Sequence, residues 1–306
     1  MSRFAVIDVG TNSVKFHVGE LEADGTWRTV ADRAEVTRLG EGLDESGRLG
    51  AEPMARTVEA IADMVDEARR EGAAEIVAVG TAGMRIASNS AELVDAVRDR
   101  TGVEIEVVPG DEEARLAYRA AISGLGLGDA AGSLVVFDTG GGSSQFTFGR
   151  GAKVEDRFSV DVGAAKFTER YYLDGRVMRP VLLEAVDAIG AALSRLDGRP
   201  PPDAVVGMGG AVTNLAAVKL GLGEYDRDAV QGTVLDLAEI DRQARMYAGL
   251  NADERRAIAG LQPKRAEVIL AGACIVHTVL VKLRCGALTV SDRGLRHGLL
   301  AERCGA

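Results

Sequence analysis

The chain has 306 residues, which is enough for two domains that each bury a core of their own. Apolar residues make up 46% and charged residues 27%, a balance that excludes a disordered, fibrous or disulfide-stapled protein. Acidic side chains outnumber basic ones by 46 to 36, and the formal net charge is −10. This balance argues against nucleic acid and against an anionic membrane as partners, because both attract a cationic surface.

The sequence also bears on where the protein works. No apolar run approaches the roughly 20 residues that a helix needs to cross a bilayer, and Met1 to Phe4 lead into a strand-like run without a signal-peptide pattern. We therefore expect a cytoplasmic protein. An odd number of cysteines without a C-x-x-C pair suits a reducing compartment: Cys274, Cys285 and Cys304. The histidines are scattered along the chain, and we expect structural roles for them: His17, His277 and His297.

The first half of the chain predicts a hairpin followed by alternating helices and strands. Residues 4–8 and 14–18 have the apolar pattern of two strands, joined by a short polar turn. The elements expected next are a strand near 28–38, a helix over 52–72, a strand over 76–80, a helix over 90–101 with Ser90 as its N-cap, a strand over 103–108 and a helix from about 111.

The same order begins again after a glycine-rich segment at 124–132. A second strand–turn–strand unit starts at Leu134, and further strands are expected over 150–160, 204–208 and 286–290. The turns Asp8-x-Gly10 and Asp138-x-Gly140 open the two halves, which indicates an internal duplication of an α/β unit. We predict domains at 1–123 and 124–306, with a last helix that can pack back on the first domain.

The two opening turns have the composition of phosphate-binding loops. Turns rich in Gly, Ser, Thr and Asn present backbone N–H groups and hydroxyls without bulky side chains. The aspartate before each turn, Asp8 and Asp138, adds a carboxylate suited to Mg²⁺. The alternative is that the glycines only make tight turns. Two such turns at matching positions favour phosphate binding, and facing turns could clamp a phosphate chain between the halves.

Three further segments carry candidate chemistry. Glycine turns follow strands at 80–85 and 207–213, where ligands bind in open α/β sheets. Arg85 ends the first of them and could bind a phosphate, although an arginine after a turn is more often a solvated charge. Residues 109–118 place Asp111, Glu112 and Glu113 in a first helical turn. The helix dipole alone would favour acids there, but one glutamate could also orient an attacking water.

Taken together, the motifs resemble the exopolyphosphatase/guanosine pentaphosphate phosphatase (Ppx/GppA) family, in its short two-domain form. The matching segments run in family order along essentially the whole chain: 8–13 (DVGTNS), 38–43 (RLGEGL), 80–85 (GTAGMR), 110–115 (GDEEAR), 138–144 (DTGGGSS), 163–169 (GAAKFTE), 207–210 (GMGG) and 290–296 (VSDRGLR). The resemblance implies an α/β fold of two actin-like ATPase (ribonuclease H-like) domains with a central cleft.

The resemblance also implies an activity and a site. The activity is Mg²⁺-dependent hydrolysis of a terminal phosphoanhydride bond in inorganic polyphosphate or guanosine pentaphosphate, with other divalent cations as possible replacements. Glu113 resembles the carboxylate that activates water, and Asp8 and Asp138 resemble the metal ligands. The implied phosphate-binding positions are Thr11, Asn12, Ser13, Arg85, Gly141, Gly142, Ser143, Ser144, Lys166, Gly209 and Arg293. Lys166 and Arg293 could instead only brace the cleft. Because the family commonly forms dimers, a homodimer is plausible.

One departure from the family pattern opens an alternative. Members usually carry glutamate where this chain has Gln145, which keeps the shape and an acceptor oxygen but loses charge and basicity. Loss of that carboxylate would weaken Mg²⁺ binding or slow turnover, unless Glu113 suffices as the base and Gln145 positions the water. A catalytically weak sensor of polyphosphate or a nucleotide is therefore the second hypothesis. An actin-like kinase or ATPase is the third, because the fold alone does not determine chemistry.

Overall fold

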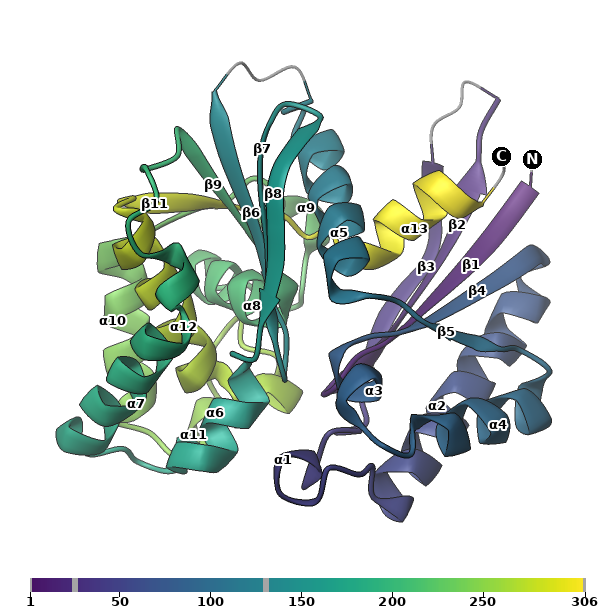
Figure 1. Ribbon diagram of the computed structural model, residues 1–306, viewed down its shortest axis with the longest axis horizontal. Helices are drawn as coiled ribbons and strands as arrows, with labels where there is room; N and C mark the ends of the chain where they lie inside the picture. The colour runs from purple at the N-terminus through teal and green to yellow at the C-terminus, as the bar shows by residue number, and fades with distance from the viewer. Residues whose placement is uncertain (1, 24–26, 129–131, 305–306) are drawn as a thin grey trace. The chain divides into compact units, whose positions relative to one another are not determined.

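The computed structural model describes residues 2–23, 27–128 and 132–304, which form two compact units (Figure 1). Unit 1 consists of residues 2–116 and 295–304, and unit 2 of residues 117–294. The chain passes from one to the other inside the helix Gly110–Gly124, whereas the boundary expected from the sequence, 123/124, lies at the end of that helix. Helix Leu295–Arg303 belongs to unit 1.

Unit 1 is built on a five-stranded mixed sheet in the order β3-β2-β1-β4-β5. Strands β1, β2 and β3 pair antiparallel, and β1, β4 and β5 pair parallel. The strands are β1 Ser2–Val9, β2 Ser13–Leu21, β3 Trp27–Val36, β4 Ala73–Gly80 and β5 Ile105–Val107. The helices are α1 Leu43–Ser46, α2 Ala51–Arg70, α3 Ala82–Ile86, α4 Ser90–Thr101, the first part of α5 Gly110–Gly124, and α13 Leu295–Arg303.

Both faces of this sheet are covered, as the alternation of side chains along β1 requires. Ile7 points into a core shared with Ile61 and Met64 of α2. Val6, its neighbour, points into a second core shared with Leu299 of α13. Each fully buried side chain of this size is worth about 1.5–3 kcal/mol. The last helix is therefore an integral layer of unit 1.

Unit 2 has a six-stranded sheet in the order β10-β11-β9-β6-β7-β8. Its strands are β6 Ser133–Thr139, β7 Ser144–Arg150, β8 Lys153–Val160, β9 Ala204–Met208, β10 Val234–Asp236 and β11 Ala287–Val290. Its helices are the rest of α5, α6 Ala164–Tyr171, α7 Arg179–Ala192, α8 Gly209–Leu220, α9 Arg227–Val230, α10 Leu237–Ala248, α11 Ala252–Arg255 and α12 Ile269–Leu283, with 3₁₀ turns η1 Ser194–Leu196 and η2 Pro263–Arg265. Helix α12 is apolar nearly all round and is buried against α6, α7, α8 and α10.

The two units repeat one arrangement, in agreement with the predicted duplication. In unit 1, β1 pairs antiparallel with β2 and parallel with β4; in unit 2, β6 pairs antiparallel with β7 and parallel with β9. Some details differ from the expectation. The short edge strand β10 and the short helices α1 and α3 were not predicted, and the N-cap of α4 is Asn89 rather than Ser90. The Asn89 side chain bonds the backbone of Leu49 at 2.8 Å, so it fixes a loop instead of the helix end.

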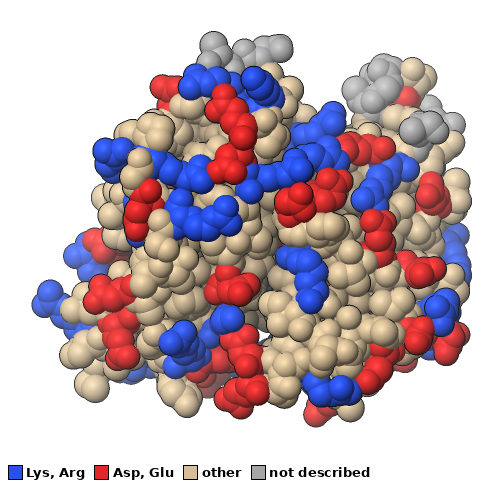
Figure 2. Space-filling model, viewed as in Figure 1, with Lys and Arg blue, Asp and Glu red and all other residues tan. Residues whose placement is uncertain are grey.

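The surface carries charges of both signs close together. Figure 2 shows lysines and arginines beside aspartates and glutamates on the face in view. Ion pairs are part of this mixed surface; Arg199, for example, pairs with Asp156. Within the three described ranges, no helix combines the length and apolar character that a transmembrane span requires. The three cysteines are free, and burial raises the pKa of Cys274 to about 12 and that of Cys304 to about 11.

Candidate functional site

The first turn of unit 1 is held in shape by its own backbone and by a neighbouring loop. The Gly10 amide donates to the Ser13 carbonyl at 3.1 Å, and the Thr11 carbonyl accepts from the Gly40 amide at 2.8 Å. A Cβ atom at Gly83 would lie 3.1 Å from the Thr11 hydroxyl oxygen. Three of the motifs identified in the sequence, at 8–13, 38–43 and 80–85, therefore meet at Thr11. Asn12 and Ser13, the other predicted residues of this turn, are both buried.

Asp8, the predicted metal ligand of unit 1, has a cationic partner. Asp8 and Lys15 are directly opposite each other in the β1–β2 pair, and Lys15 Nζ lies 3.3 Å from Asp8 Oδ2. The Asp8 side chain is buried and the Lys15 side chain is partly exposed, and the ion pair balances the aspartate's charge. Sequence reasoning missed Lys15. Its signal was a lysine between the apolar Val14 and Phe16 of a buried strand.

Arg85 and Glu113, predicted separately as a phosphate ligand and a catalytic carboxylate, bind each other. Arg85 Nη1 lies 2.7 Å from Glu113 Oε2 and also donates to the Val108 carbonyl at 3.0 Å. Arg85 comes from the last turn of α3, and Glu113 from the first turn of α5. Their side chains are 22% and 12% exposed, so both reach the surface of unit 1. A charge-assisted bond of this length fixes the direction of the carboxylate.

The preceding glutamate belongs to a different network. Both carboxylate oxygens of Glu112 accept from Arg115, at 2.8 and 2.7 Å. Arg115 also donates to both oxygens of Glu302 on α13, at 3.0 and 2.7 Å. The two carboxylates raise the pKa of Arg115. Arg115 thus connects Glu112 of α5 to Glu302 of α13, whereas Glu113 binds Arg85 of α3.

The glycine turn of unit 2 is joined to the start of α6. The Gly140 amide donates to the Ser143 carbonyl at 2.9 Å, while the Gly140 carbonyl accepts from the Ala164 amide at 2.9 Å. A Cβ atom at Gly163 would lie only 2.2 Å from the Gly141 carbonyl oxygen, so the close approach requires glycine there. The first amides of α6 are therefore satisfied by the turn. Gly142 also lies against Gly163, and Lys166 follows in the first turn of α6.

Asp138, the predicted metal ligand of unit 2, lies near the end of β6, and its carboxylate is next to two glycines. A Cβ atom at Gly209 would be 2.4 Å from Asp138 Oδ1, and one at Gly294 would be 3.9 Å from Oδ2. Gly209 also has a φ of +88°, which disfavours any other residue. A buried carboxylate within reach of backbone groups is a hard oxygen donor of the type that Mg²⁺ prefers. The residues around Asp138 therefore fit the predicted metal.

Gln145 is directly opposite Asp138 in the antiparallel β6–β7 pair. Its amide nitrogen donates to the Ser143 hydroxyl at 2.6 Å and approaches the Ser159 hydroxyl at 3.4 Å. Ser144, the next residue back, is fully buried, and its hydroxyl donates to the Val162 carbonyl at 2.6 Å. The hydroxyl of Ser144, a predicted phosphate-binding residue, is thus used in a hydrogen bond that holds the fold together.

The motif at 290–296 is held by a network that the sequence did not reveal. Arg227 Nε lies 2.8 Å from Asp292 Oδ2, and the Tyr225 hydroxyl donates to Asp292 Oδ1. Burial, helped by the negative charge of Asp292, raises the pKa of Tyr225. The exposed Arg293 lies with its side chain against Gly124, where a Cβ atom would be 2.5 Å from Arg293 Cδ. This contact favours a bracing role for Arg293.

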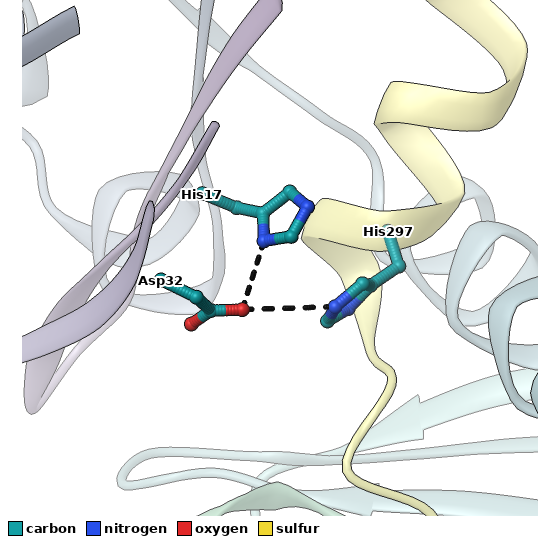
Figure 3. A group of neighbouring side chains, drawn as sticks. All are labelled: His17, Asp32 and His297. Carbon is teal, nitrogen blue, oxygen red and sulfur yellow. Dashed lines mark hydrogen bonds and ion pairs between the residues drawn. The ribbon is translucent and has the colours of Figure 1, made fainter. Parts of the chain in front are cut away.

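A second polar cluster brings together two histidines that are far apart in the sequence (Figure 3). His17 Nδ1 lies 2.8 Å from Asp32 Oδ2, His297 Nε2 lies 3.7 Å from the same oxygen, and the two rings are 4.7 Å apart. Arg296 contacts both oxygens of Asp32, at 3.1 and 3.2 Å. His17 and His297 are thus neighbours in space although they are far apart in the sequence, because α13 packs against the sheet of unit 1.

This histidine cluster is better explained as an anchor than as a metal centre. Its donor atoms are of the kind that bind zinc, but tetrahedral zinc places donors about 3.3 Å apart, and here a hydrogen-bond distance of 2.8 Å joins His17 to Asp32. The Arg296 guanidinium already neutralises the carboxylate. The cluster therefore fixes α13 on the sheet of unit 1.

Comparison with known proteins adds relatives along the whole chain. The sequence profile of the Ppx/GppA phosphatase family matches residues 20–305. The chain is 30% identical to exopolyphosphatase 2 of Mycobacterium tuberculosis over 100% of this chain and 99% of that protein. It is 29% identical to the guanosine-5'-triphosphate,3'-diphosphate pyrophosphatase of Photobacterium profundum, covering 98% of this chain but 59% of that longer protein.

Solved structures are similar as well. The crystal structure of the Aquifex aeolicus member of the Ppx/GppA family superimposes with a TM-score of 0.82 at 30% identity, covering 98% of this chain and 96% of that one. An exopolyphosphatase from Cytophaga hutchinsonii, at 23% identity, has a TM-score of 0.89 with coverage of 98% and 96% and shows the same fold.

Proposed function

Because the chain belongs to the Ppx/GppA phosphatase family, we propose that it is a magnesium-dependent phosphohydrolase of inorganic polyphosphate or guanosine pentaphosphate. The bond cleaved is the terminal phosphoanhydride. The observation that carries the proposal is the position of Glu113: a carboxylate in the first turn of α5, directed by Arg85, on the unit that also holds the turn after β1. The full-length similarity to a named exopolyphosphatase supports the substrate class.

The reaction needs one proton acceptor and several groups that stabilise negative charge. Glu113 takes a proton from water as the water oxygen attacks the terminal phosphorus, and the bond from phosphorus to the bridging oxygen breaks with its electron pair on the leaving chain. A positioned general base of this kind contributes about 10²–10⁴-fold to the rate. Arg85 and the backbone amides of the glycine turns stabilise the charge that develops on the phosphoryl oxygens.

Asp138 and Asp8 are the residues that would hold Mg²⁺. Asp138 has the stronger case, because its buried carboxylate lies against Gly209 and offers hard oxygen donors. Asp8 would share its carboxylate between the ion and Lys15. When bound, Mg²⁺ supplies electrostatic stabilisation to the phosphate oxygens. Substitutions can compare what the two aspartates contribute to Mg²⁺ binding. Asp138→Asn should raise the Mg²⁺ concentration needed for half-maximal activity more than Asp8→Asn does.

The deciding experiment is phosphate release with Mg²⁺ from long-chain polyphosphate and, in parallel, from guanosine pentaphosphate. Wild-type protein should release phosphate from at least one of them, and Glu113→Gln should abolish the release without loss of the fold. Glu112→Gln is the matched control, because Glu112 is the neighbouring acid in the first turn of α5 but binds Arg115. Wild-type protein that is silent on both substrates, or a fully active Glu113→Gln protein, would refute the proposal.

Gln145 favours one second candidate, a sensor that binds the polyanion but hydrolyses it poorly. Its neutral amide lies opposite Asp138, where relatives of this family are expected to have a carboxylate. Calorimetry on wild-type protein separates the two functions, because a sensor binds tightly without forming phosphate. We further propose that the protein is a cytoplasmic homodimer, and sedimentation at micromolar concentration tests the dimer.

A further inference from the structure

The ion pair between Arg85 and Glu113 limits how well Glu113 can perform its proposed role in the state described here. A general base must accept a proton, yet a guanidinium 2.7 Å away stabilises the charged carboxylate and makes it a weaker proton acceptor. The Arg85 nitrogen that would face a competing anion, Nη1, is bound to Glu113 and to the Val108 carbonyl, whereas Nε and Nη2 of the same guanidinium can approach a phosphate first. The ion pair is therefore a resting arrangement in which Glu113 is a weaker base than it would be with Arg85 turned fully to the substrate.

We propose that Arg85 exchanges partners, leaving Glu113 for the terminal phosphate of the substrate, so that phosphate binding itself releases the base. The inference rests on the proposed function and adds a regulatory step to its site. No covalent bond changes in this step: one N–H···O contact to a carboxylate is replaced by one to a phosphate oxygen. The free enzyme thus keeps Glu113 a weak base, and only the enzyme with substrate in place makes it effective.

The surroundings of the pair suit such an exchange. Arg85 is 22% exposed, so a polyanion can reach its guanidinium without unfolding α3. The Val108 carbonyl, at 3.0 Å, gives the guanidinium a second point of attachment while it turns from one anion to the other. Gly83, two residues before Arg85, packs on Thr11 of the turn that is proposed to bind phosphate. Arg85 therefore follows directly after a segment that contacts that turn.

Glu113 is held independently of Arg85, so it can remain in place when the arginine leaves. Its amide donates to the Pro109 carbonyl at 3.0 Å in the first turn of α5. The charged groups around it in that turn are Asp111, which is exposed, and Glu112, whose charge is matched by Arg115. The next helix in contact, α13, directs Glu302 to Arg115 as well. Loss of the Arg85 contact removes the positive charge 2.7 Å from the carboxylate, which raises its affinity for a proton.

A static ion pair makes a different prediction from an exchanging one. If Glu113 competes with phosphate for Arg85, removing the carboxylate must tighten phosphate binding, and it must do so only when Arg85 is present. If Arg85 only positions Glu113, removing the carboxylate changes affinity by general charge repulsion, to the same degree with or without Arg85. A double-mutant cycle on ligand affinity separates these outcomes.

The experiment is calorimetric titration with imidodiphosphate, whose P–N–P bridge resists hydrolysis, in the presence of Mg²⁺. The proteins are wild type, Glu113→Gln, Arg85→Met and the double variant, with Glu112→Gln as the control for charge removal. We expect Glu113→Gln to bind about ten-fold tighter than wild type, and the double variant to bind within about two-fold of Arg85→Met. Glu112→Gln should stay within about two-fold of wild type. Equal tightening by Glu113→Gln in both Arg85 backgrounds would overturn the exchange.

The pH dependence of turnover gives an independent readout. The acid limb of kcat/KM reports the free enzyme and that of kcat the bound enzyme, so exchange places the kcat limb at higher pH. In Arg85→Met the two limbs should move together, and Arg85→Lys should restore part of the separation. Coincident limbs in wild type would contradict the exchange. If the wild-type protein hydrolyses its substrate but the two substitutions have additive effects on affinity, the exchange is refuted and the hydrolase function is not. If the effects are coupled but no phosphate is released, the hydrolase function is refuted and the exchange is not.

Discussion

Glu112 and Glu113 are consecutive in the first turn of α5, yet their carboxylates bind different arginines, Arg115 and Arg85. Side chains that follow one another in a helix point about 100° apart, so neighbours in sequence serve different surroundings. Glu112 faces α13 through Arg115 and Glu302, and Glu113 faces the segment that follows β4. The sequence motif alone does not separate these two roles.

The first prediction follows from this division. Glu113→Gln should lower kcat by about 10²–10⁴-fold, the contribution of a general base. Glu112→Gln should change kcat by less than about five-fold, but it should lower the free energy of unfolding by about 1 kcal/mol, because one carboxylate of the Arg115 network is lost. Steady-state phosphate release and urea denaturation of both variants measure the two effects. A Glu112→Gln protein as inactive as Glu113→Gln would mean that the roles are assigned wrongly.

The second prediction concerns Gln145→Glu. The new carboxylate would accept hydrogen bonds from the Ser143 and Ser159 hydroxyls and add negative charge opposite Asp138. We expect the Mg²⁺ concentration for half-maximal activity to fall by about 10-fold, in the range typical of groups that support a metal ligand. Titration of activity with Mg²⁺ measures this, with Gln145→Leu as the variant that removes the polar group. If the titration curves of wild type and Gln145→Glu coincide, the family's carboxylate is dispensable here.

A third prediction tests the junction between the glycine turn of unit 2 and α6. Gly163→Ala places a methyl group 2.2 Å from the Gly141 carbonyl oxygen, and the backbone must shift to accommodate it. We expect a loss of about 1–3 kcal/mol in the free energy of unfolding, as in other overpacked sites. Gly286→Ala is the control, because no atom lies within 4 Å of the added carbon there. Equal stability of the two variants by denaturant unfolding would show that the turn yields without cost.

The fourth prediction concerns Arg255, which is fully buried in unit 2 and donates to four backbone carbonyls, those of Tyr247, Leu173, Ala266 and Gly175. Burial lowers its pKa to about 10, so it remains charged at neutral pH. Arg255→Met leaves those carbonyls without donors and should cost about 3–5 kcal/mol of stability. The exposed neighbour Arg256 provides the control: Arg256→Met should cost less than about 1 kcal/mol. Thermal and urea unfolding of both proteins distinguish them.

The fifth prediction concerns the anchor of α13. Asp32→Asn removes the charge that His17, Arg296 and His297 share, so α13 should open more often. Amide hydrogen exchange should accelerate about 10-fold or more across α13 and less elsewhere in unit 1. Glu35→Gln, on the same strand but with a side chain 42% exposed, should leave exchange in α13 unchanged. Unaltered exchange in Asp32→Asn would mean that apolar packing alone holds the helix.

Much of the fold could be predicted from local patterns. The family, the fold class of two α/β units and the hydrolase class are confirmed, because glycine turns after apolar strands carry their signal over a few residues. The predicted site residues, Mg²⁺, the homodimer and the cytoplasmic location stay predictions. Asp8 with Lys15 and Asp138 with Gln145 also repeat one cross-strand position, which the spacing of each hairpin could have revealed.

Contacts between distant segments were beyond the sequence. The pairing of Arg85 with Glu113 depends on β4 and β5 lying side by side, and the meeting of His17 with His297 depends on α13 returning to the first unit. Neither is encoded in the spacing of the residues themselves. The predicted N-cap of α4, Ser90, was wrong for a related reason. The N-cap residue is Asn89, and its side chain binds the backbone of Leu49, 40 positions earlier in the chain.

The place of α13 in unit 1 has a consequence for how the protein is made. Phe4, Val6 and Val79 pack against Leu299 and Leu300, which the ribosome adds only after all of unit 2. At about 5–20 residues per second, the roughly 180 residues of unit 2 keep that sheet face uncovered for about 10–35 s. During this interval the nascent first half exposes an apolar surface to chaperones and to other chains. The order of synthesis therefore makes unit 2 the first to complete its core, although unit 1 begins the chain.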